Sequence, residues 1–151
     1  MVTMAGTQNT KEALVRSLLN LEQDALEAYT ETIERLENPA FISQITAFKN
    51  DHLSHVDQLS GIAAQLGVPV PDGTMKSMLA KGKVVIADLG GDDAILKAMK
   101  SNENDTVKAY ENALENDFLS PELRACCERG LADERRHRAW MEQAGEQAKA
   151  A

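Results

Sequence analysis

Two segments of this chain repeat the same pattern of polar and aromatic residues. Glu22 precedes Tyr29 by seven residues, and Glu103 precedes Tyr110 by the same interval. The two glutamates and the two tyrosines are therefore separated by the same offset, and each copy is followed by a proline and then by a histidine-bearing segment. A chain built this way is constrained to fold as two copies of one unit, and we expect a pseudo-two-fold axis to relate them.

The histidine-bearing segments continue the repeat. DHLSH ends at His55, and DERRH ends at His137. These histidines are separated by the same offset as the prolines that precede them, Pro39 and Pro121. This offset exceeds that of the tyrosines by one, so a single inserted residue between Tyr110 and Pro121 accounts for the step.

Composition limits the class of protein. The chain has 151 residues, of which 43% are hydrophobic, so one domain with a real core is expected. A net charge of −8 argues against a nucleic-acid partner. The N-terminus lacks the basic start and apolar stretch of a signal peptide, and no apolar run approaches the roughly 18 residues of a membrane span. We therefore expect a cytoplasmic protein without a membrane partner.

The chain has two cysteines, and they are adjacent. Cys126 and Cys127 are poorly placed for a disulfide with each other and lack the spaced pairs of a zinc finger. We expect both to be small residues of a helix core, kept reduced.

Hydrophobic residues recur with the 3.6-residue period of a helix in four places, and no clear strand pattern appears. The predicted helices run from about Lys11 to Glu37, from about Pro39 to Leu66, from after Gly91 to about Asn116, and from Pro121 to about Gln147.

Residues suited to begin a helix precede each predicted helix. Asn9 with Glu12 is expected to form a capping box for the first helix. Asn38 before Pro39 is expected to cap the second, and Ser120 with the proline that follows repeats this device in the fourth. In the third, we expect the cap to be the first or second residue of the Asp92-Asp93 pair.

Loop lengths predict the connectivity. The first and last connections are short, so helices 1 and 2, and helices 3 and 4, should form antiparallel hairpins. The connection over 68–91 is long and is expected to contain a short helix over 74–89. The predicted fold is an all-α four-helix bundle with a crossover, in a single domain over 11–147 that follows a flexible N-terminus over 1–10.

Six ionisable residues fall on the predicted core faces of the four helices, and all three histidines of the chain are among them. They are Glu22, His52, His55, Glu103, Glu134 and His137. A buried charge without a partner is costly, so six at matched repeat positions favour a bound metal. The alternative is that hydrogen bonds satisfy them, for example from Tyr29 and Tyr110, which could also simply fill the core.

The spacing and the residue types suit a metal. His52 and His55 are three residues apart, as are Glu134 and His137, and residues i and i+3 project to the same side of a helix. Carboxylate oxygen together with imidazole nitrogen suits iron, manganese or zinc rather than a thiophilic metal.

At these residues the chain resembles the ferritin-like superfamily. That superfamily builds a di-iron carboxylate site from one glutamate on each of two helices and Glu-x-x-His on the other two. Glu22 and Glu103 match the single glutamates, and Glu134 with His137 matches one Glu-x-x-His. His52 departs from the pattern, because it stands where the family has its second bridging glutamate. The resemblance implies a ferritin-like bundle with a metal site whose ligands include these residues and His55.

The stretch 73–114 is also similar to an uncharacterised bacterial group within the superfamily. That group has no settled activity, so this second resemblance implies a fold rather than a function.

The histidine at position 52 removes one negative charge and one bridging carboxylate, so several forms of the metal site are possible. The site could hold two ions bridged by Glu134 alone, or one ion, or it could have lost redox activity. Three functions follow: an iron oxidase or oxygen- or peroxide-handling protein, a non-catalytic metal binder, and a metal-free bundle acting in stress or as an interaction module. Whether the chain is an enzyme stays open, and we expect a monomer or homodimer.

Overall fold

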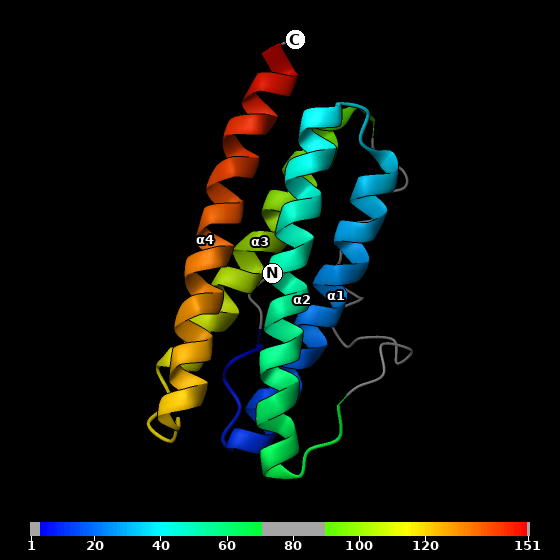
Figure 1. Ribbon diagram of the computed structural model, residues 1–151. Coiled ribbons are helices and arrows are strands. Elements are labelled where there is room, and N and C mark those ends of the chain that lie inside the picture. The colour runs from blue at the N-terminus through cyan, green and yellow to red at the C-terminus, as the bar shows by residue number, and fades with distance from the viewer. Residues whose placement is uncertain (1–3, 71–89, 151) are drawn as a thin grey trace.

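The computed structural model describes residues 4–70 and 90–150, and those segments contain four α-helices and no strand. The helices are α1 (Lys11–Arg35), α2 (Pro39–Leu66), α3 (Asp92–Leu114) and α4 (Pro121–Ala150). They form a bundle (Figure 1). The predicted all-α four-helix bundle is confirmed.

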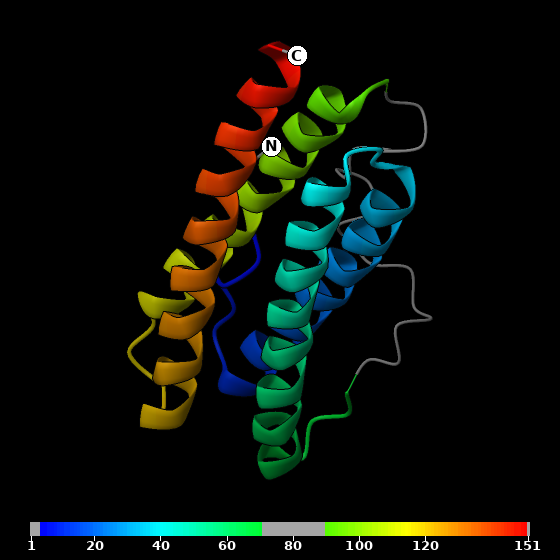
Figure 2. The same cartoon turned by 45° about the horizontal axis from the view of Figure 1, so that its top comes forward.

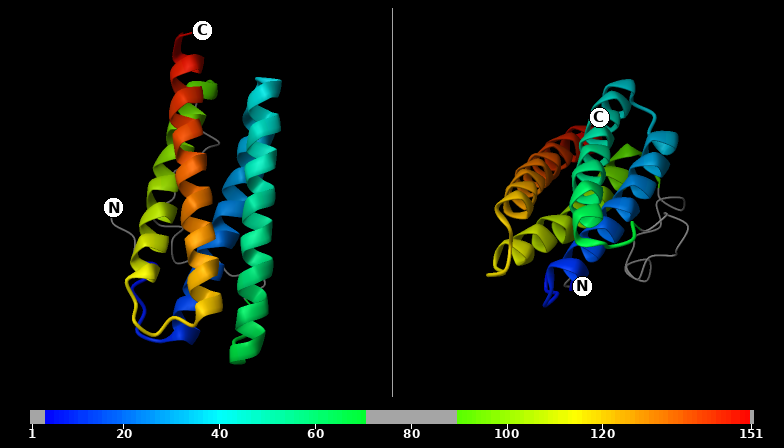
Figure 3. Two further views of the ribbon diagram at one scale, coloured as in Figure 1. Left: turned by 60° about the vertical axis from the view of Figure 1, so that its left-hand side comes forward. Right: turned by 60° about the horizontal axis from the view of Figure 1, so that its bottom comes forward.

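The helices associate as two antiparallel hairpins. Figure 2 shows them as separate pairs, α1 with α2 and α3 with α4. Across the bundle, α1 contacts α3 and α2 contacts α4. Helices α1 and α4 run in one direction and α2 and α3 in the other, so each contact across the bundle is also antiparallel (Figure 3). This direction requires a long crossover after α2, as predicted; the predicted short helix over 74–89 lies outside the described residues.

The start of α1 differs from the prediction. Thr10 is the N-cap, with extended backbone angles, and its side chain accepts a hydrogen bond from the backbone N–H of Ala13. The predicted Asn9–Glu12 capping box is therefore wrong. The helix begins at Lys11, so Thr10 is the residue whose hydroxyl reaches an unpaired N–H of the first turn.

The caps of α2 and α4 are as predicted. The Asn38 side chain accepts from the N–H of Ala40, and the Ser120 hydroxyl accepts from the N–H of Leu123. Helix α2 ends at Gly67, whose φ of 70° is left-handed and therefore suits glycine.

The cap of α3 is not an aspartate. Gly91 is the N-cap and makes no side-chain hydrogen bond. The Asp92 carboxylate instead accepts from the N–H groups of Glu37 and Asn38, each at 2.9 Å. Those two N–H groups lie in the α1–α2 turn, so Asp92 joins the start of the second hairpin to the turn of the first.

Helix ends differ from prediction by a few residues. Helix α1 stops at Arg35 rather than Glu37, because Leu36 is already extended. Helix α3 stops at Leu114, and α4 continues to Ala150 rather than Gln147. Shifts of this size are common at frayed helix ends.

Two apolar clusters fill the bundle. One lies at the end of the bundle where α1 and α4 begin and α2 and α3 end, and it includes Leu14, Leu18, Leu59 and Leu123. The other lies towards the opposite end and includes the residues Phe41, Phe48, Leu96, Met99 and Met141. The six predicted site residues lie between the two clusters along each helix, so apolar side chains exclude water from both ends of the site.

Residues of the N-terminal segment contact α3. Asn112 and Asn116 donate side-chain hydrogen bonds to the carbonyls of Ala5 and Gly6. Gly6 has a φ of 87°, and a Cβ there would lie 2.2 Å from the carbonyl oxygen of Ala109. Only glycine allows this approach. The flexibility predicted for residues 1–10 and the domain bounds stay predictions.

Both cysteines are buried and free, as expected. Burial raises the pKa of the Cys126 thiol to about 11 and that of Cys127 to about 12. Neither thiol forms a reactive thiolate near neutral pH.

Candidate metal centre

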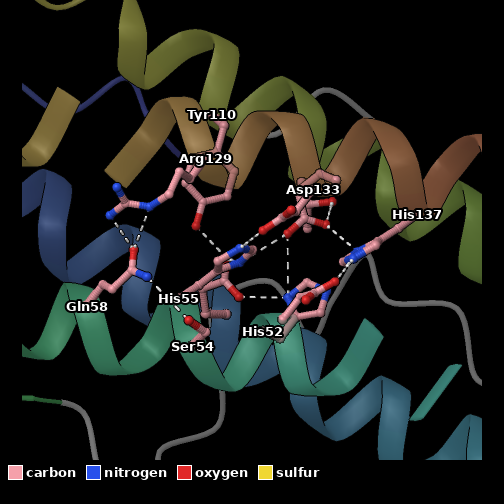
Figure 4. Close-up of polar contacts among 12 residues, drawn as sticks. His52, Ser54, His55, Gln58, Tyr110, Arg129, Asp133 and His137 are labelled. Atoms are coloured by element: carbon pink, nitrogen blue, oxygen red, sulfur yellow. Dashed lines mark hydrogen bonds and ion pairs between the residues drawn. The ribbon is translucent and has the colours of Figure 1, made fainter. Parts of the chain in front are cut away.

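All six residues predicted to form the site converge between the helices. Glu22 comes from α1, His52 and His55 from α2, Glu103 from α3, and Glu134 and His137 from α4. Each is at most 2% exposed. Figure 4 shows the histidines of α2 facing Asp133 and His137 of α4.

The six residues form two overlapping groups, each able to offer four ligand atoms that lie within 4.8 Å of one another. The first group is Glu22, His52, His55 and Glu134. The second group is His52, Glu103, Glu134 and His137. His52 and Glu134 belong to both, and each group could hold a metal ion.

In the first group, imidazole nitrogens surround one carboxylate. His52 Nδ1 lies 2.7 Å from Glu22 Oε2, and His55 Nδ1 lies 3.1 Å from Glu22 Oε1. Glu134 Oε1 lies 3.5 Å from both of these nitrogens. Donor atoms from three helices thus face one small volume.

In the second group, the shared residues present their remaining donor atoms, Glu134 Oε2 and His52 Nε2. Glu134 Oε2 lies 3.4 Å from His137 Nδ1, and His52 Nε2 lies 3.8 Å from Glu103 Oε1. Thr106, which the sequence analysis did not identify, donates from its hydroxyl to Glu103 Oε2 at 2.9 Å. Its position three residues after Glu103 on α3 was the available signal.

The two tyrosines bind the two single glutamates across the repeat. Tyr29 of the first hairpin donates to Glu103 of the second, and Tyr110 of the second donates to Glu22 of the first. Burial and the neighbouring carboxylates raise the pKa of both phenols, so both stay protonated and remain donors. The reciprocal contacts are what a pseudo-two-fold axis produces.

Two aspartates hold the outer nitrogens of His55 and His137. Asp133 Oδ2 lies 2.7 Å from His55 Nε2, and Asp51 Oδ2 lies 2.8 Å from His137 Nε2. Arg136 donates to both aspartates, at 2.8 Å to Asp51 and 3.0 Å to Asp133. Each aspartate therefore fixes the ring orientation of a histidine from the other hairpin. The Nδ1 atom of that histidine then faces the centre.

Neither aspartate was predicted as a site residue. Asp51 and Asp133 each stand four residues before a site histidine, at matched positions of the repeat. Each aspartate contacts the histidine of the opposite helix, and the spacing within one helix does not specify that contact.

Burial and the neighbouring charged groups together set the protonation states of the buried site residues. Burial alone raises the pKa of Glu22, but His52 and His55 outweigh burial and bring it down to about 2. Burial and the nearby Glu103 raise the pKa of Glu134 well above 4.5. Burial likewise lowers the pKa of His52 and His55, yet the surrounding carboxylates outweigh it and raise both.

His137 is the exception among the histidines. Burial lowers its pKa below 6.5, although Glu103 and Asp51 oppose this. The ring is therefore neutral near pH 7, donates from Nε2 to Asp51, and presents the Nδ1 lone pair to the centre. It also stacks on Phe48, with ring centroids 4.2 Å apart.

The donor set fits a divalent cation. Among residues 4–70 and 90–150, the buried side-chain polar atoms without a hydrogen-bond partner are His52 Nε2 and Glu134 Oε1. Both belong to the residues shared by the two groups. An unpaired buried polar atom is costly, and a cation would give both atoms a partner.

Comparison with known protein families matches residues 10–116 to a model described as Domain of unknown function (DUF2383). The chain belongs to this family. The matched residues span α1, α2 and α3 and include Glu22, His52, His55 and Glu103. No curated protein and no solved structure matches the chain.

None of the described helices is long and apolar enough to cross a bilayer.

Proposed function

We propose that this protein binds iron at the centre of the bundle, in a site of ferritin-like type. One observation carries the proposal: two four-residue groups of buried carboxylates and imidazoles share His52 and Glu134, and these residues carry the unpaired atoms. Oxygen and nitrogen donors in this mixture suit iron, and manganese or zinc would fit the same atoms.

Each residue has a distinct part in the proposed site. Glu22 and Glu103 supply one carboxylate to each group, and the tyrosine that donates to each carboxylate fixes its orientation. His55 and His137 supply Nδ1 donors that the aspartates hold in place. Bound iron would supply the electrons needed to reduce dioxygen or peroxide. The apolar clusters at both ends would keep bulk water away from that chemistry.

Elemental analysis of protein purified without added metal is the first test. We expect iron, or manganese or zinc in its place, to copurify, and we expect anaerobic iron(II) titration to saturate at one or two ions per chain. Glu103→Gln should weaken binding by about 10-fold or more, whereas Glu111→Gln, at a partly buried surface position of the same helix, should not. Equal iron binding by both variants and wild type would contradict the proposal.

Dioxygen and peroxide consumption separates a catalyst from a storage or buffering protein. We propose an oxidase or peroxide-handling activity, for which iron-loaded protein should consume either oxidant over many turnovers when iron(II) is resupplied. A single stoichiometric reaction would instead indicate a non-catalytic metal binder.

A metal-free bundle is the second candidate, and one observation favours it. The raised pKa of His52 and His55 and the lowered pKa of Glu22 and Glu103 allow positive and negative charges to balance without an ion. Such a bundle would act as an interaction module or in a stress response. It would contain no copurifying metal, and its melting temperature would be the same with and without a chelator.

The proposal includes a cytoplasmic setting and a monomer or homodimer. Buried free thiols at Cys126 and Cys127 suit a reducing compartment, and the net charge of −8 disfavours nucleic acid as a partner. Light scattering after size exclusion would determine the oligomeric state.

A further inference from the structure

We infer that His52 is a bridging ligand: it offers one ring nitrogen to each of the two groups and replaces a bridging carboxylate in position and in charge. The inference rests on the proposed function, because it names how the two metal positions of the same site are joined. It concerns the residue at which this chain departs from a symmetric arrangement of glutamates.

The orientation of the His52 ring is the first argument. Nδ1 lies 2.7 Å from Glu22 Oε2 and 3.5 Å from Glu134 Oε1, so this nitrogen faces the first group. Nε2 points the other way, 3.8 Å from Glu103 Oε1 in the second group. No hydrogen bond from the described residues reaches Nε2, although the whole side chain is buried. The single imidazole ring of His52 thus presents one nitrogen to each of the two groups.

Glu134 provides the internal comparison, because it stands at the position of the second repeat that matches His52 in the first. Its Oε1 faces the first group, 3.5 Å from His55 Nδ1, and its Oε2 faces the second, 3.4 Å from His137 Nδ1. His52 and Glu134 therefore span the same two groups from opposite hairpins. An imidazole can do this because, like a carboxylate, it has two donor atoms.

Charge gives the second argument. Two divalent cations bring four positive charges, and the three carboxylates of the two groups bring three negative charges. Binding through both nitrogens releases every ring proton to solvent, two from a protonated ring or one from a neutral ring, and leaves a singly negative ring. The bridging ring then supplies the missing negative charge between two cations that repel each other.

The test uses cobalt(II), added anaerobically to apo protein labelled with nitrogen-15 at histidine, and proton spectroscopy of the loaded form. A histidine bound through one nitrogen keeps a solvent-exchangeable ring N–H, which cobalt shifts far from the normal range. We expect two ions per chain and two such signals, from His55 and His137. His55→Gln and His137→Gln should each remove one signal and so assign it. A bridging His52 contributes none.

Two substitutions at the bridge give an independent measurement. His52→Glu keeps a negatively charged group with two donor atoms, and should still bind two cobalt ions. His52→Gln supplies only a neutral amide, and should weaken the second ion by about 10-fold or more. Circular dichroism of the apo variants checks the fold, and if His52→Gln does not fold, the signals of the wild-type protein decide the question alone.

The outcomes separate the inference from the proposed function. A third exchangeable ring signal that disappears in His52→Gln would show His52 bound through one nitrogen, and would overturn the inference while leaving the metal site intact. Saturation at one ion per chain would do the same. Failure of the wild-type protein to bind any cobalt, iron, manganese or zinc would overturn both.

Discussion

At the scale of single residues, orientation is decided by partners from the opposite hairpin. His55 and His137 could each present either ring nitrogen to the centre, and the outer aspartates make the choice by engaging Nε2. A ligand held in one orientation loses less freedom when a metal binds. The aspartates are partly exposed, at 30–32%, so they also lie between the buried centre and solvent.

Replacing either aspartate should weaken metal binding without unfolding the protein. We expect Asp51→Ala and Asp133→Ala each to reduce affinity by about 10- to 100-fold, because His137 or His55 loses the partner that orients it. Asp57→Ala, at an exposed position of α2, is the control and should bind as wild type does. Calorimetric titration with zinc measures the effect. Unchanged affinity in both site variants would show that the histidines are oriented by packing alone.

Gly130 provides a second prediction at this scale. A Cβ at this position would lie 2.6 Å from the ring of Tyr110, which is fully buried and donates to Glu22. We expect Gly130→Ala to lower the free energy of unfolding by about 1–3 kcal/mol, because the ring has no free space to move into. Urea unfolding measures this change.

Gly61→Ala is the matched control for Gly130→Ala. Gly61 also lies within a helix, but nothing lies within 4 Å of its added Cβ. Alanine there should raise the free energy of unfolding by up to about 1 kcal/mol, because it favours the helix. Similar effects at both positions would mean that Tyr110 can move away from α4.

At the scale of the elements, Asp92 joins two parts of the chain that are distant in sequence. It is the first residue of α3, and both carboxylate oxygens accept from backbone N–H groups of the α1–α2 turn. Those N–H groups immediately precede α2, which carries both histidines of the first hairpin. Asp92 thus helps to set the position of α3 relative to α2.

Asp92→Ala should therefore lower stability more than Asp93→Ala. We expect a loss of about 0.5–2 kcal/mol for Asp92→Ala, comparable to the loss of a helix cap, because two backbone donors lose their partner. Both aspartates lie in the first turn of α3, so their interactions with the helix dipole are matched. Thermal unfolding compares the two variants, and equal losses would assign the effect to the dipole instead.

At the scale of the whole molecule, the ionisable centre is one of the places where the two hairpins meet. Its histidines and carboxylates come from all four helices, so its protonation state contributes to the stability of the entire bundle. The raised pKa of His52 and His55 means that the folded apo protein holds protons there that the unfolded chain releases near pH 6.5. The raised pKa of Glu134 acts in the same direction.

The apo protein should consequently lose stability as pH rises above 6.5. A group whose pKa is raised on folding contributes stability that is complete below its unfolded value and is lost as pH rises through the folded value. Each such group changes stability by up to about 1.4 kcal/mol per pH unit. Below 4.5 the lowered pKa of Glu22, about 2, causes a separate loss as pH falls.

Metal should reverse the trend above pH 6.5, because cations and protons compete for the same lone pairs. Melting curves from pH 5 to 9, with chelator and with zinc, test the predicted fall in apo stability and the predicted rise in stabilisation by metal. We expect zinc to add little below about pH 6, where His52 and His55 are protonated, and progressively more at higher pH. Apo stability that rises from pH 6.5 to 9 would contradict the assigned protonation states.

The repeat and the helical period were enough to predict the four helices, the two hairpins and the six residues that meet between them. These properties depend on local periodicity and on the copying of one unit, both of which are present in the linear sequence. The tertiary structure decided what depends on how the hairpins approach each other. Asp92 accepts from a turn of the other hairpin instead of capping α3, and Asp51 and Asp133 bind histidines of the opposite helix rather than their own. The direction of each His52 nitrogen was likewise set by the carboxylates that α1, α3 and α4 bring around the ring, and no spacing within α2 specifies it.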